Sequence, residues 1–189
     1  MRTLKLQTTL TIDGFGIQPS GETQESFTWD EEINDFCVDN LHDVDAIVLG
    51  RNTADEFIPY WMDVAENPAH ELYKLGKPLT DIPKVVFSNR PPADGWYNTT
   101  VANGDLSTAV QRLKNESGKS MLTYGGYSFV SSLIEKDLID DYYLLMHPVM
   151  IGRGETIFNN LTHARKLKLQ QYRVFPSGTV LLHYTKPVR

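Results

Sequence analysis

The sequence predicts an α/β protein, in which helices flank a central, mostly parallel sheet with an antiparallel C-terminal hairpin. Over the first two thirds of the 189-residue chain, short apolar runs alternate with helical patterns, as in βαβ units. The last third contains three successive strand patterns, and Pro176-Ser177-Gly178 predicts a turn between the last two. Because no repeat or linker divides the sequence, we predict one domain over residues 1–189.

The first elements follow from local patterns of apolar and turn residues. Apolar residues from Leu4 to Leu10 alternate with polar ones, which predicts a strand that Asp13-Gly14 ends. The segment from Thr28 to Glu31 is a capping box, so a helix is expected to begin with Thr28 as its N-cap. Residues 45–49 (DAIVL) form a short apolar run, which predicts a buried strand.

The middle of the chain is expected to be less regular. A short helix is predicted to follow Gly50 and to reach Phe57. Residues 58–82 contain three prolines, which interrupt helices and strands. We therefore expect a long excursion there, with a helix only around residues 69–75.

The second half returns to clear strand and helix patterns. KVVF at 84–87 predicts a buried strand, and residues 97–101 a weaker one. Asp105 is expected to cap a helix, and a strand at 120–124 leads through two glycines into another helix. Further strands are predicted at 141–149, 166–175 and 179–185.

Composition and charge exclude several classes of function. Hydrophobic residues make up 41% of the chain and charged residues 22%, as in ordinary globular proteins. A formal net charge of −6 argues against non-specific nucleic-acid binding, which needs a basic surface. Cys37 is the only cysteine, and we expect a packed thiol. No metal site is predicted, because His42, His70, His163 and His183 lack the spacing of metal ligands.

The N-terminal sequence and the apolar runs bear on location. The first fourteen residues alternate instead of forming the apolar block of a signal peptide. No apolar run is long enough to cross a bilayer. We therefore predict a cytoplasmic protein with no membrane partner.

Three predicted strands end in residues suited to a phosphorylated ligand. The first runs into Gly50-Arg51-Asn52-Thr53, the second into Ser88-Asn89-Arg90, and the third into Gly125-Gly126-Tyr127-Ser128. Ligands of open α/β sheets bind at the carboxyl ends of strands. Arginine supplies forked donors, and glycine lets phosphate approach the amides of a helix N-terminus. The two glycines have two explanations, a tight turn or a close ligand, and the three endings together favour a dinucleotide.

The type of dinucleotide follows from what these endings contain. No G-x-G-x-x-G follows the first strand, and no acid lies about 20 residues beyond one to hold a free ribose 2′-hydroxyl. The candidate groups are arginine and serine instead. They favour a ribose 2′-phosphate, so NADP is predicted over NAD.

The same motifs carry a family resemblance. The chain resembles the dihydrofolate reductase fold and is most similar to the reductase domain of bifunctional riboflavin-biosynthesis enzymes and their stand-alone bacterial relatives. The matching segments are TIDG at 11–14, IVLGRNT at 47–53, VVFSNR at 85–90, TYGGYSFVSSLI at 123–134 and LIDDYYLLMHPVMIGRGETIF at 138–158, followed by the terminal hairpin. They occur in family order across nearly the whole chain.

The resemblance implies an NADPH-dependent reductase that transfers hydride from the nicotinamide to a small-molecule substrate. It places residues 50–53 and 88–90 at the adenosine side, residues 125–128 at the pyrophosphate, and Thr9 by the nicotinamide. It also implies a homodimer. Asp13 matches an aspartate of the riboflavin-type reductases, which gives it a role in substrate contact or proton relay, but Asp-Gly is also a common turn pair.

The residues around the substrate are less sharply indicated. Trp29, Tyr60 and Trp61 are candidates for covering a planar substrate, or are anchors buried under a long loop. His147 is expected to be packed and hydrogen-bonded. Dihydrofolate reductases carry a pterin-binding acid in the helix after the first strand, and Asn34 occupies that position by spacing.

The leading hypothesis is a reductase that resembles 5-amino-6-(5-phosphoribosylamino)uracil reductase of riboflavin biosynthesis. The first alternative is a dihydrofolate or other pterin reductase. The second, of a different class, is a non-catalytic NADP-binding protein that kept the cofactor site and lost the reaction.

Overall fold

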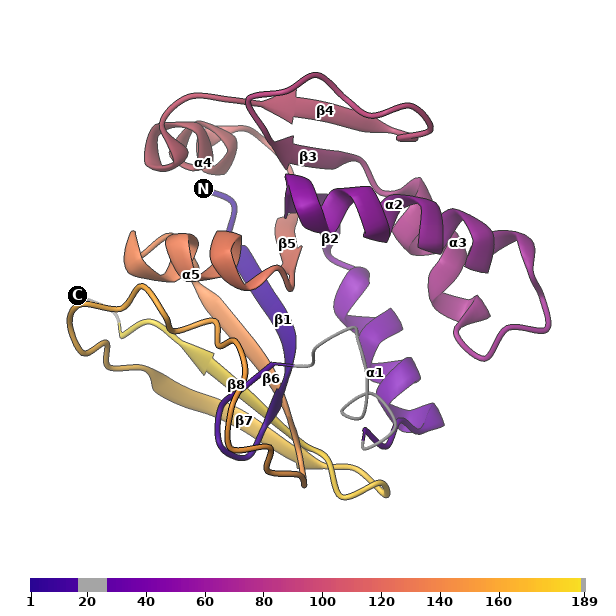
Figure 1. The fold of residues 1–189 in the computed structure, drawn as a ribbon, viewed down its shortest axis with the longest axis vertical. Helices are drawn as coiled ribbons and strands as arrows, with labels where there is room; N and C mark the ends of the chain where they lie inside the picture. The colour runs from indigo at the N-terminus through magenta and orange to yellow at the C-terminus, as the bar shows by residue number, and fades with distance from the viewer. Residues whose placement is uncertain (17–26, 188–189) are drawn as a thin grey trace. The chain divides into compact units, whose positions relative to one another are not determined.

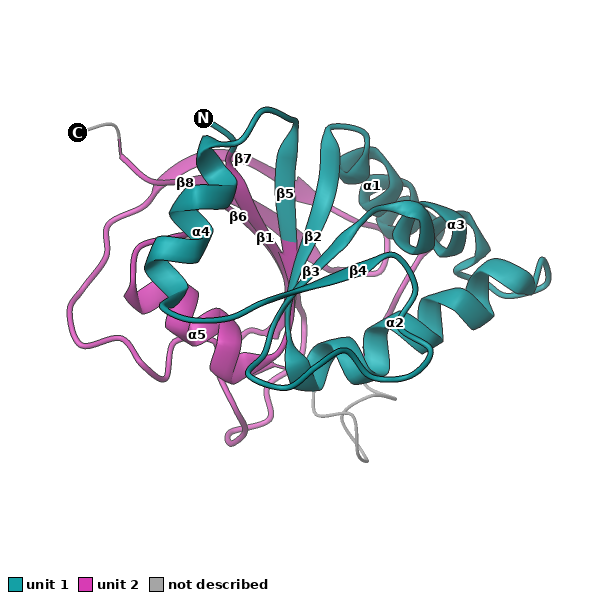
Figure 2. Ribbon diagram, turned by 90° about the horizontal axis from the view of Figure 1, so that it is seen from above, with its two compact units in different colours: residues 1–2, 31–122 teal, residues 3–30, 123–189 magenta. Residues whose placement is uncertain are grey.

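The computed structural model describes residues 1–16 and 27–187 and places eight strands and five helices in them (Figure 1). Two compact units divide the chain (Figure 2). The first contains residues 1–2 and 31–122, and the second contains residues 3–30 and 123–189. The second division falls inside a strand, between Leu122 and Thr123, and not in a linker.

The first unit is a parallel α/β layer. Its strands follow the order β4-β3-β2, and the β2–β3 and β3–β4 pairs are both parallel. Helix α2 packs on β2, β3 and α3, and α1 packs on α3. The elements are α1 (Glu31–Leu41), β2 (Val44–Gly50), α2 (Arg51–Glu66), α3 (Tyr73–Asp81), β3 (Lys84–Phe87), β4 (Thr99–Ala102), α4 (Leu106–Asn115) and the first residues of β5 (Ser120–Tyr124).

Helix α2 is the main departure from the sequence prediction. It does not end near Phe57 but continues through Pro59 to Glu66. Its buried residues are Ala54, Ile58 and Val64, and the packing of α2 against the sheet and α3 outweighs the local cost of an exposed proline. Much of the expected excursion is therefore helical.

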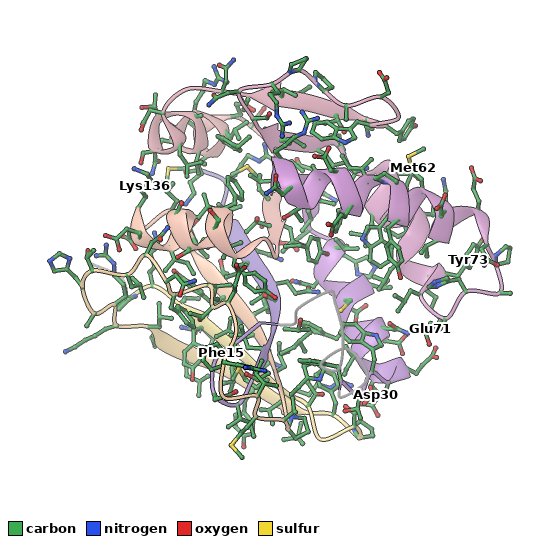
Figure 3. The ribbon with its side chains drawn as sticks, viewed as in Figure 1. Phe15, Asp30, Met62, Glu71, Tyr73 and Lys136 are labelled. Carbon is green, nitrogen blue, oxygen red and sulfur yellow. The ribbon has the colours of Figure 1, made fainter. Side chains whose placement is uncertain are left out.

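The connection from α2 leads into α3. This helix begins at Tyr73 and ends at Asp81, later than the helix predicted around residues 69–75. Figure 3 shows Glu71 and Tyr73 on the outer side of this helix pair. Lys84 lies buried where α3 gives way to β3, and its ammonium group donates to the carbonyl oxygen of Thr80 near the end of α3. This bond satisfies one of the carbonyl groups that a helix C-terminus leaves without a partner.

The second unit combines parallel and antiparallel pairing. β1 (Leu4–Thr11) is parallel to β6 (Asp141–His147), and β8 (Val180–Thr185) pairs antiparallel with both β6 and β7 (Lys168–Val174). Helix α5 (Tyr127–Glu135) lies over this sheet in Figures 1 and 2. The parallel pairs of both units and the antiparallel C-terminal strands confirm the predicted fold class.

Other local predictions have mixed outcomes. The Asp105 carboxylate accepts from the amide of Thr108 at 2.9 Å, which confirms the predicted cap of α4. Cys37 is buried on α1, as predicted. Thr28, however, is not the cap of α1, since its hydroxyl donates to the carbonyl of Ser177 at 3.2 Å and the helix begins at Glu31.

Within the described parts of the chain, no helix combines the length and apolarity needed to span a bilayer.

Candidate functional site

Two of the three predicted strand endings lie side by side in the first unit. β2 and β3 are parallel neighbours, and Gly50 lies opposite Phe87 in their register. The residues that follow therefore leave the same edge of the sheet. The structure brings together the predicted adenosine-side residues Gly50, Arg51, Asn52, Thr53, Ser88, Asn89 and Arg90.

Helix α2 starts with features that suit an anion. Gly50 is its N-cap and offers no side-chain acceptor, and its first turn contains no acidic residue. Unpaired amides and the helix dipole make such an end favourable for negative charge. Asn52 is exposed and Thr53 is half-buried in this first turn.

The guanidinium of Arg51 is held by several groups of the first unit. Its Nε donates to the carboxylate of Asp55, with distances of 3.1 and 3.0 Å to the two oxygens. Its Nη1 donates to the carbonyl oxygen of Pro91 at 2.6 Å, and the group lies 4.5 Å from the ring centroid of Trp96. Arg51 is therefore fixed in place, and its side chain is 17% exposed.

Ser88 shapes the second strand ending. Its hydroxyl accepts from the amide of Arg90 at 3.0 Å and donates to the carbonyl of the same residue at 3.1 Å. These bonds form a turn that directs Asn89 and Arg90 to the surface, where both are exposed. The Ser88 hydroxyl is thus already used by the loop.

The two glycines of the third ending, in the second unit, serve different needs. Gly126 is the N-cap of α5 with a φ of 83°, a left-handed conformation that strongly favours glycine. Gly125 does not have a positive φ, and a Cβ added to it would have no other described atom within 4 Å. The backbone therefore requires glycine at position 126, whereas neither the backbone nor the surrounding packing requires it at 125.

Tyr127 anchors the start of α5. A Cβ added to Gly16 would overlap the phenol ring of Tyr127, so the ring packs directly on this glycine. Burial, with a smaller contribution from Glu155, raises the pKa of Tyr127 to about 12, and the phenol is neutral at pH 7. Ser128 is exposed on the first turn of the same helix.

Asp13 ties two loops of the second unit together. Its carboxylate accepts from the Thr11 hydroxyl at 2.5 Å and from the amides of Gly152 at 2.7 Å and Ile151 at 3.1 Å. The bond from Thr11, followed by that from Gly152, lowers the pKa of Asp13, so the exposed carboxyl is ionised at neutral pH. In this arrangement Asp13 can accept hydrogen bonds but is a poor proton donor.

Thr9 and Asp13 belong to one strand and the loop that follows it. Thr9 is half-buried in β1 opposite Leu145, and Asp13 comes two residues after β1 ends. The structure thus places the predicted nicotinamide-side residue and the predicted catalytic residue near the same end of β1. The loop-shaping role of Asp13 is present in its contacts, and its catalytic role stays a prediction.

His147 forms a buried aromatic cluster. Its ring centroid lies 4.5 Å from that of Phe27 and 6.4 Å from that of Trp29, which is stacked on it. Burial lowers the pKa of His147 to about 4, so the imidazole is neutral at pH 7. Its packed, hydrogen-bonded state, expected from the sequence, is confirmed by a 3.3 Å bond between Nδ1 and the Thr179 hydroxyl.

Thr179 links His147 to the turn before β8. Its hydroxyl lies 3.2 Å from the Ser177 hydroxyl and 3.3 Å from Nδ1 of His147. The other ring nitrogen, Nε2, has no hydrogen-bond partner among the described residues. Asp30, labelled in Figure 3, accepts from the Ser177 amide at 2.9 Å and so attaches the segment after Trp29 to the same turn.

The predicted substrate residues fall into two groups. Tyr60 and Trp61 are neighbours on α2 in the first unit, with ring centroids 5.1 Å apart. Trp29 belongs to the second unit, where it is 40% exposed over His147. Tyr60 is also exposed and Trp61 half-buried, so a substrate role and an anchoring role both stay predictions.

Sequence reasoning missed the partners of Arg51 and of His147. Asp55 could have been found from its i,i+4 spacing to Arg51 on a helix. Pro91, Trp96 and Phe27 lie in loops with no local pattern that indicates a partner. Their contacts became visible only in the folded chain.

The fold, a mostly parallel sheet with antiparallel C-terminal strands and flanking helices, is that of the dihydrofolate-reductase-like superfamily. A match to the family described as RibD C-terminal domain covers residues 2–181. The chain belongs to this family, which is the reductase domain of riboflavin-biosynthesis enzymes that the sequence resembles.

Relatives of similar length occur in Bacillus subtilis. The chain is 29% identical over 194 residues to the uncharacterized protein YyaP, covering 97% of this chain and 94% of YyaP. It is 26% identical over 177 residues to the uncharacterized protein YwjB, covering 94% of each chain. These relatives share the full extent of the domain.

Solved structures show the same fold at lower identity. A putative riboflavin biosynthesis protein from Shewanella sp. PV-4 aligns with a TM-score of 0.75 and 19% identity, over 98% of this chain and 99% of that one. A diaminohydroxyphosphoribosylaminopyrimidine deaminase/5-amino-6-(5-phosphoribosylamino)uracil reductase from Thermotoga maritima aligns with a TM-score of 0.67 and 13% identity. That alignment covers 98% of this chain but 57% of the bifunctional enzyme.

Proposed function

We propose that this protein is an NADPH-dependent reductase that transfers hydride to a small heterocyclic or phosphoribosyl-type substrate. The closest named activity is reduction of 5-amino-6-(5-phosphoribosylamino)uracil, as in the name of the Thermotoga relative. NADPH, when bound, would supply the hydride. The roles of the protein are then to bind the cofactor, orient it and hold the acceptor.

The observation that carries this proposal is Gly125. Its missing side chain is required neither by a left-handed backbone nor by close packing among the described residues. It precedes the N-terminus of α5, whose first turn contains no acidic residue and whose N-cap has no side-chain acceptor. A glycine in open space before such a helix end suits the close approach of a pyrophosphate.

The proposed preference for NADPH rests on the first unit. Arg51 lies in the first turn of α2 and Arg90 in the loop after the neighbouring strand β3, and the pair of strand endings contains no carboxylate at the position of a ribose-binding acid. Guanidinium groups recognise phosphate by paired donors. This composition favours a cofactor with a 2′-phosphate.

Replacing Gly125 by alanine tests the cofactor site without a change in backbone strain. We expect Gly125→Ala to leave the thermal midpoint of the free protein unchanged within about 2 °C, since the added Cβ meets no described atom. We expect the Kd for NADPH, measured by fluorescence titration, to rise about tenfold or more because the methyl group occupies the ligand's place.

Glycine at 104 offers a matched control with a different expectation. Gly104 is also in open space but has a φ of 86°, so Gly104→Ala should lower the midpoint and leave the NADPH Kd unchanged. Equal NADPH binding by wild type and Gly125→Ala would contradict the assigned role of Gly125. No binding of NADPH by the wild type at sub-millimolar concentration would contradict the proposed function itself.

One observation favours the hypothesis of a riboflavin-type reductase over that of a dihydrofolate reductase. Asn34 occupies the position of the pterin-binding acid by spacing, and it is buried with its side-chain amide donating to the Glu71 carbonyl at 3.4 Å. An amide engaged in this way cannot supply the carboxylate that a pterin needs. Turnover assays with 5-amino-6-(5-phosphoribosylamino)uracil and with dihydrofolate would separate these two hypotheses. If NADPH binds but neither compound is reduced, nor any of a panel of carbonyls and imines, the non-catalytic alternative is favoured.

The proposal includes a cytoplasmic homodimer. Support for self-association comes from the end strand β7, where Leu169, Tyr172 and Val174 are 46%, 67% and 62% exposed. An edge strand with exposed apolar side chains is a ready partner for another chain. Light scattering coupled to size exclusion should give twice the 21.5 kDa chain mass, and a monomer mass would contradict this part.

A further inference from the structure

Trp96 lies in the loop after β3, a place to which the cofactor prediction assigns no role. The loop from Pro91 to Trp96 returns to the start of α2, where the Trp96 ring lies against the Arg51 guanidinium at 4.5 Å from the ring centroid. The amide of Trp96 donates to the carbonyl of Ala93 at 3.3 Å, so the ring is attached to a closed turn. Trp96 is half-buried, as expected for a ring with one covered face.

Three contacts together determine the orientation of the Arg51 guanidinium. Asp55 takes its Nε, the Pro91 carbonyl takes one N–H of Nη1, and Trp96 covers one face. A guanidinium has five N–H donors in one plane. Among the described residues no other partner occupies this group, so the two N–H groups of Nη2 and one N–H of Nη1 are left for a ligand.

The charge of the pair matters for what this edge can recognise. The Asp55 carboxylate lies 3.0 Å from Nε and offsets much of the positive charge of Arg51. Attraction of anions by net charge alone is therefore weak at this position. Recognition instead depends on the orientation of the N–H donors of Arg51, which the ring of Trp96 and the Pro91 carbonyl hold in place.

We propose that Trp96 is a positioning residue that makes Arg51 selective for a ribose 2′-phosphate. The inference rests on the proposed function and adds a determinant of cofactor choice to it. Trp96 acts through Arg51, because its ring holds the guanidinium plane in the orientation that presents two parallel donors. A side chain without an aromatic face would leave Arg51 bonded to Asp55 and Pro91, but with no ring to hold the plane of its guanidinium.

The test compares NADPH and NADH binding in four variants. Trp96→Leu should raise the Kd for NADPH about three- to tenfold and leave the Kd for NADH unchanged within about twofold, the loss expected for one stacked cation. Trp96→Phe should keep the wild-type ratio, since it keeps an aromatic face. Arg51→Lys keeps the charge but has neither fork nor plane, and it should lose the preference as Trp96→Leu does.

Tyr97→Leu is the matched control. Tyr97 is the next residue in the chain and is 52% exposed. The cation near its ring is Lys84 and not Arg51, with Nζ of Lys84 6.0 Å from the Tyr97 ring centroid. Loss of Tyr97 should change neither Kd. Equal weakening of both cofactors by Trp96→Leu, or an unchanged ratio in Trp96→Leu or Arg51→Lys, would overturn the inference.

A second measurement needs no cofactor. In the free wild type and in Trp96→Phe, the Nε–H of Arg51 should give a sharp NMR signal protected from exchange, and in Trp96→Leu the signal should broaden. A protected signal in Trp96→Leu would overturn the positioning role. A protein whose Arg51 behaves as expected but that binds neither cofactor would instead show that the proposed function fails, and with it the selective role of Trp96.

Discussion

The burial of His147 predicts a loss of stability in mild acid. Its side chain is fully buried in contact with Phe27 and Trp29, and burial lowers its pKa from 6.5 to about 4. The unfolded chain therefore takes up a proton at His147 as the pH falls below 6.5, while the folded protein does not. Stability attributable to this residue falls from pH 6.5 downward and levels off below about pH 4.

The size of the effect follows from the shift. One pKa unit corresponds to about 1.4 kcal/mol, so a shift from 6.5 to about 4 corresponds to a loss on the order of 3 kcal/mol across this range. That is a large share of the ~5–15 kcal/mol that stabilises a typical protein. The loss should be visible as a pH-dependent unfolding free energy.

Urea unfolding at several pH values between 7 and 4 would measure it, for the wild type and for His147→Gln. Glutamine does not titrate, and its side-chain amide can donate to or accept from the Thr179 hydroxyl, so the variant should show a shallower dependence on pH whatever its absolute stability. Equal slopes for wild type and His147→Gln between pH 6.5 and 4 would refute this account of His147.

Three further changes are tested by stability or hydrogen exchange and need no cofactor. Gly16→Ala should destabilise the protein by about 1–3 kcal/mol in urea unfolding, because its Cβ overlaps the ring of Tyr127; unchanged stability would mean that the ring is loosely packed. Burial lowers the pKa of Lys84 to about 8, so between pH 8 and 10.5 the unfolded chain binds a proton that the folded protein has lost, and the free energy of unfolding rises with pH. Lys84→Met should abolish this rise, and a variant that still shows it would contradict the account. Asp13→Asn should speed hydrogen exchange at the amides of Ile151 and Gly152, which would lose an ionised acceptor, and equal protection would argue against the loop tie.

The order of elements and the chemistry of the strand ends could be predicted from the sequence. Period-two and helical patterns arise from neighbours a few residues apart, so β1, β2, β3, β5 and α5 were recognisable from short segments. The adjacency of β2 and β3 agrees with the general tendency of consecutive parallel strands to lie side by side.

Two predictions from local sequence were wrong because contacts with distant residues outweighed the local preference. Thr28 has the spacing of an N-cap, but its hydroxyl bonds to Ser177, which is 149 residues away. Pro59 predicts the end of a helix, but the buried face of α2 continues past it because α3 and the sheet cover that face. In both cases tertiary packing contributes more than the local preference.

The fold class, the family and the residue types at the strand ends can be predicted from the amino-acid sequence. How those residues act on one another depends on the folded chain: the backbone requires glycine at position 126 but not at 125, Asp13 accepts from the amide of Gly152, and the Trp96 ring lies on Arg51. The difference comes from the range of the interactions. Periodicity and turn preference act between near neighbours, whereas the clasp of Asp13 joins residues 139 apart, and only the folded chain brings such residues within hydrogen-bond distance.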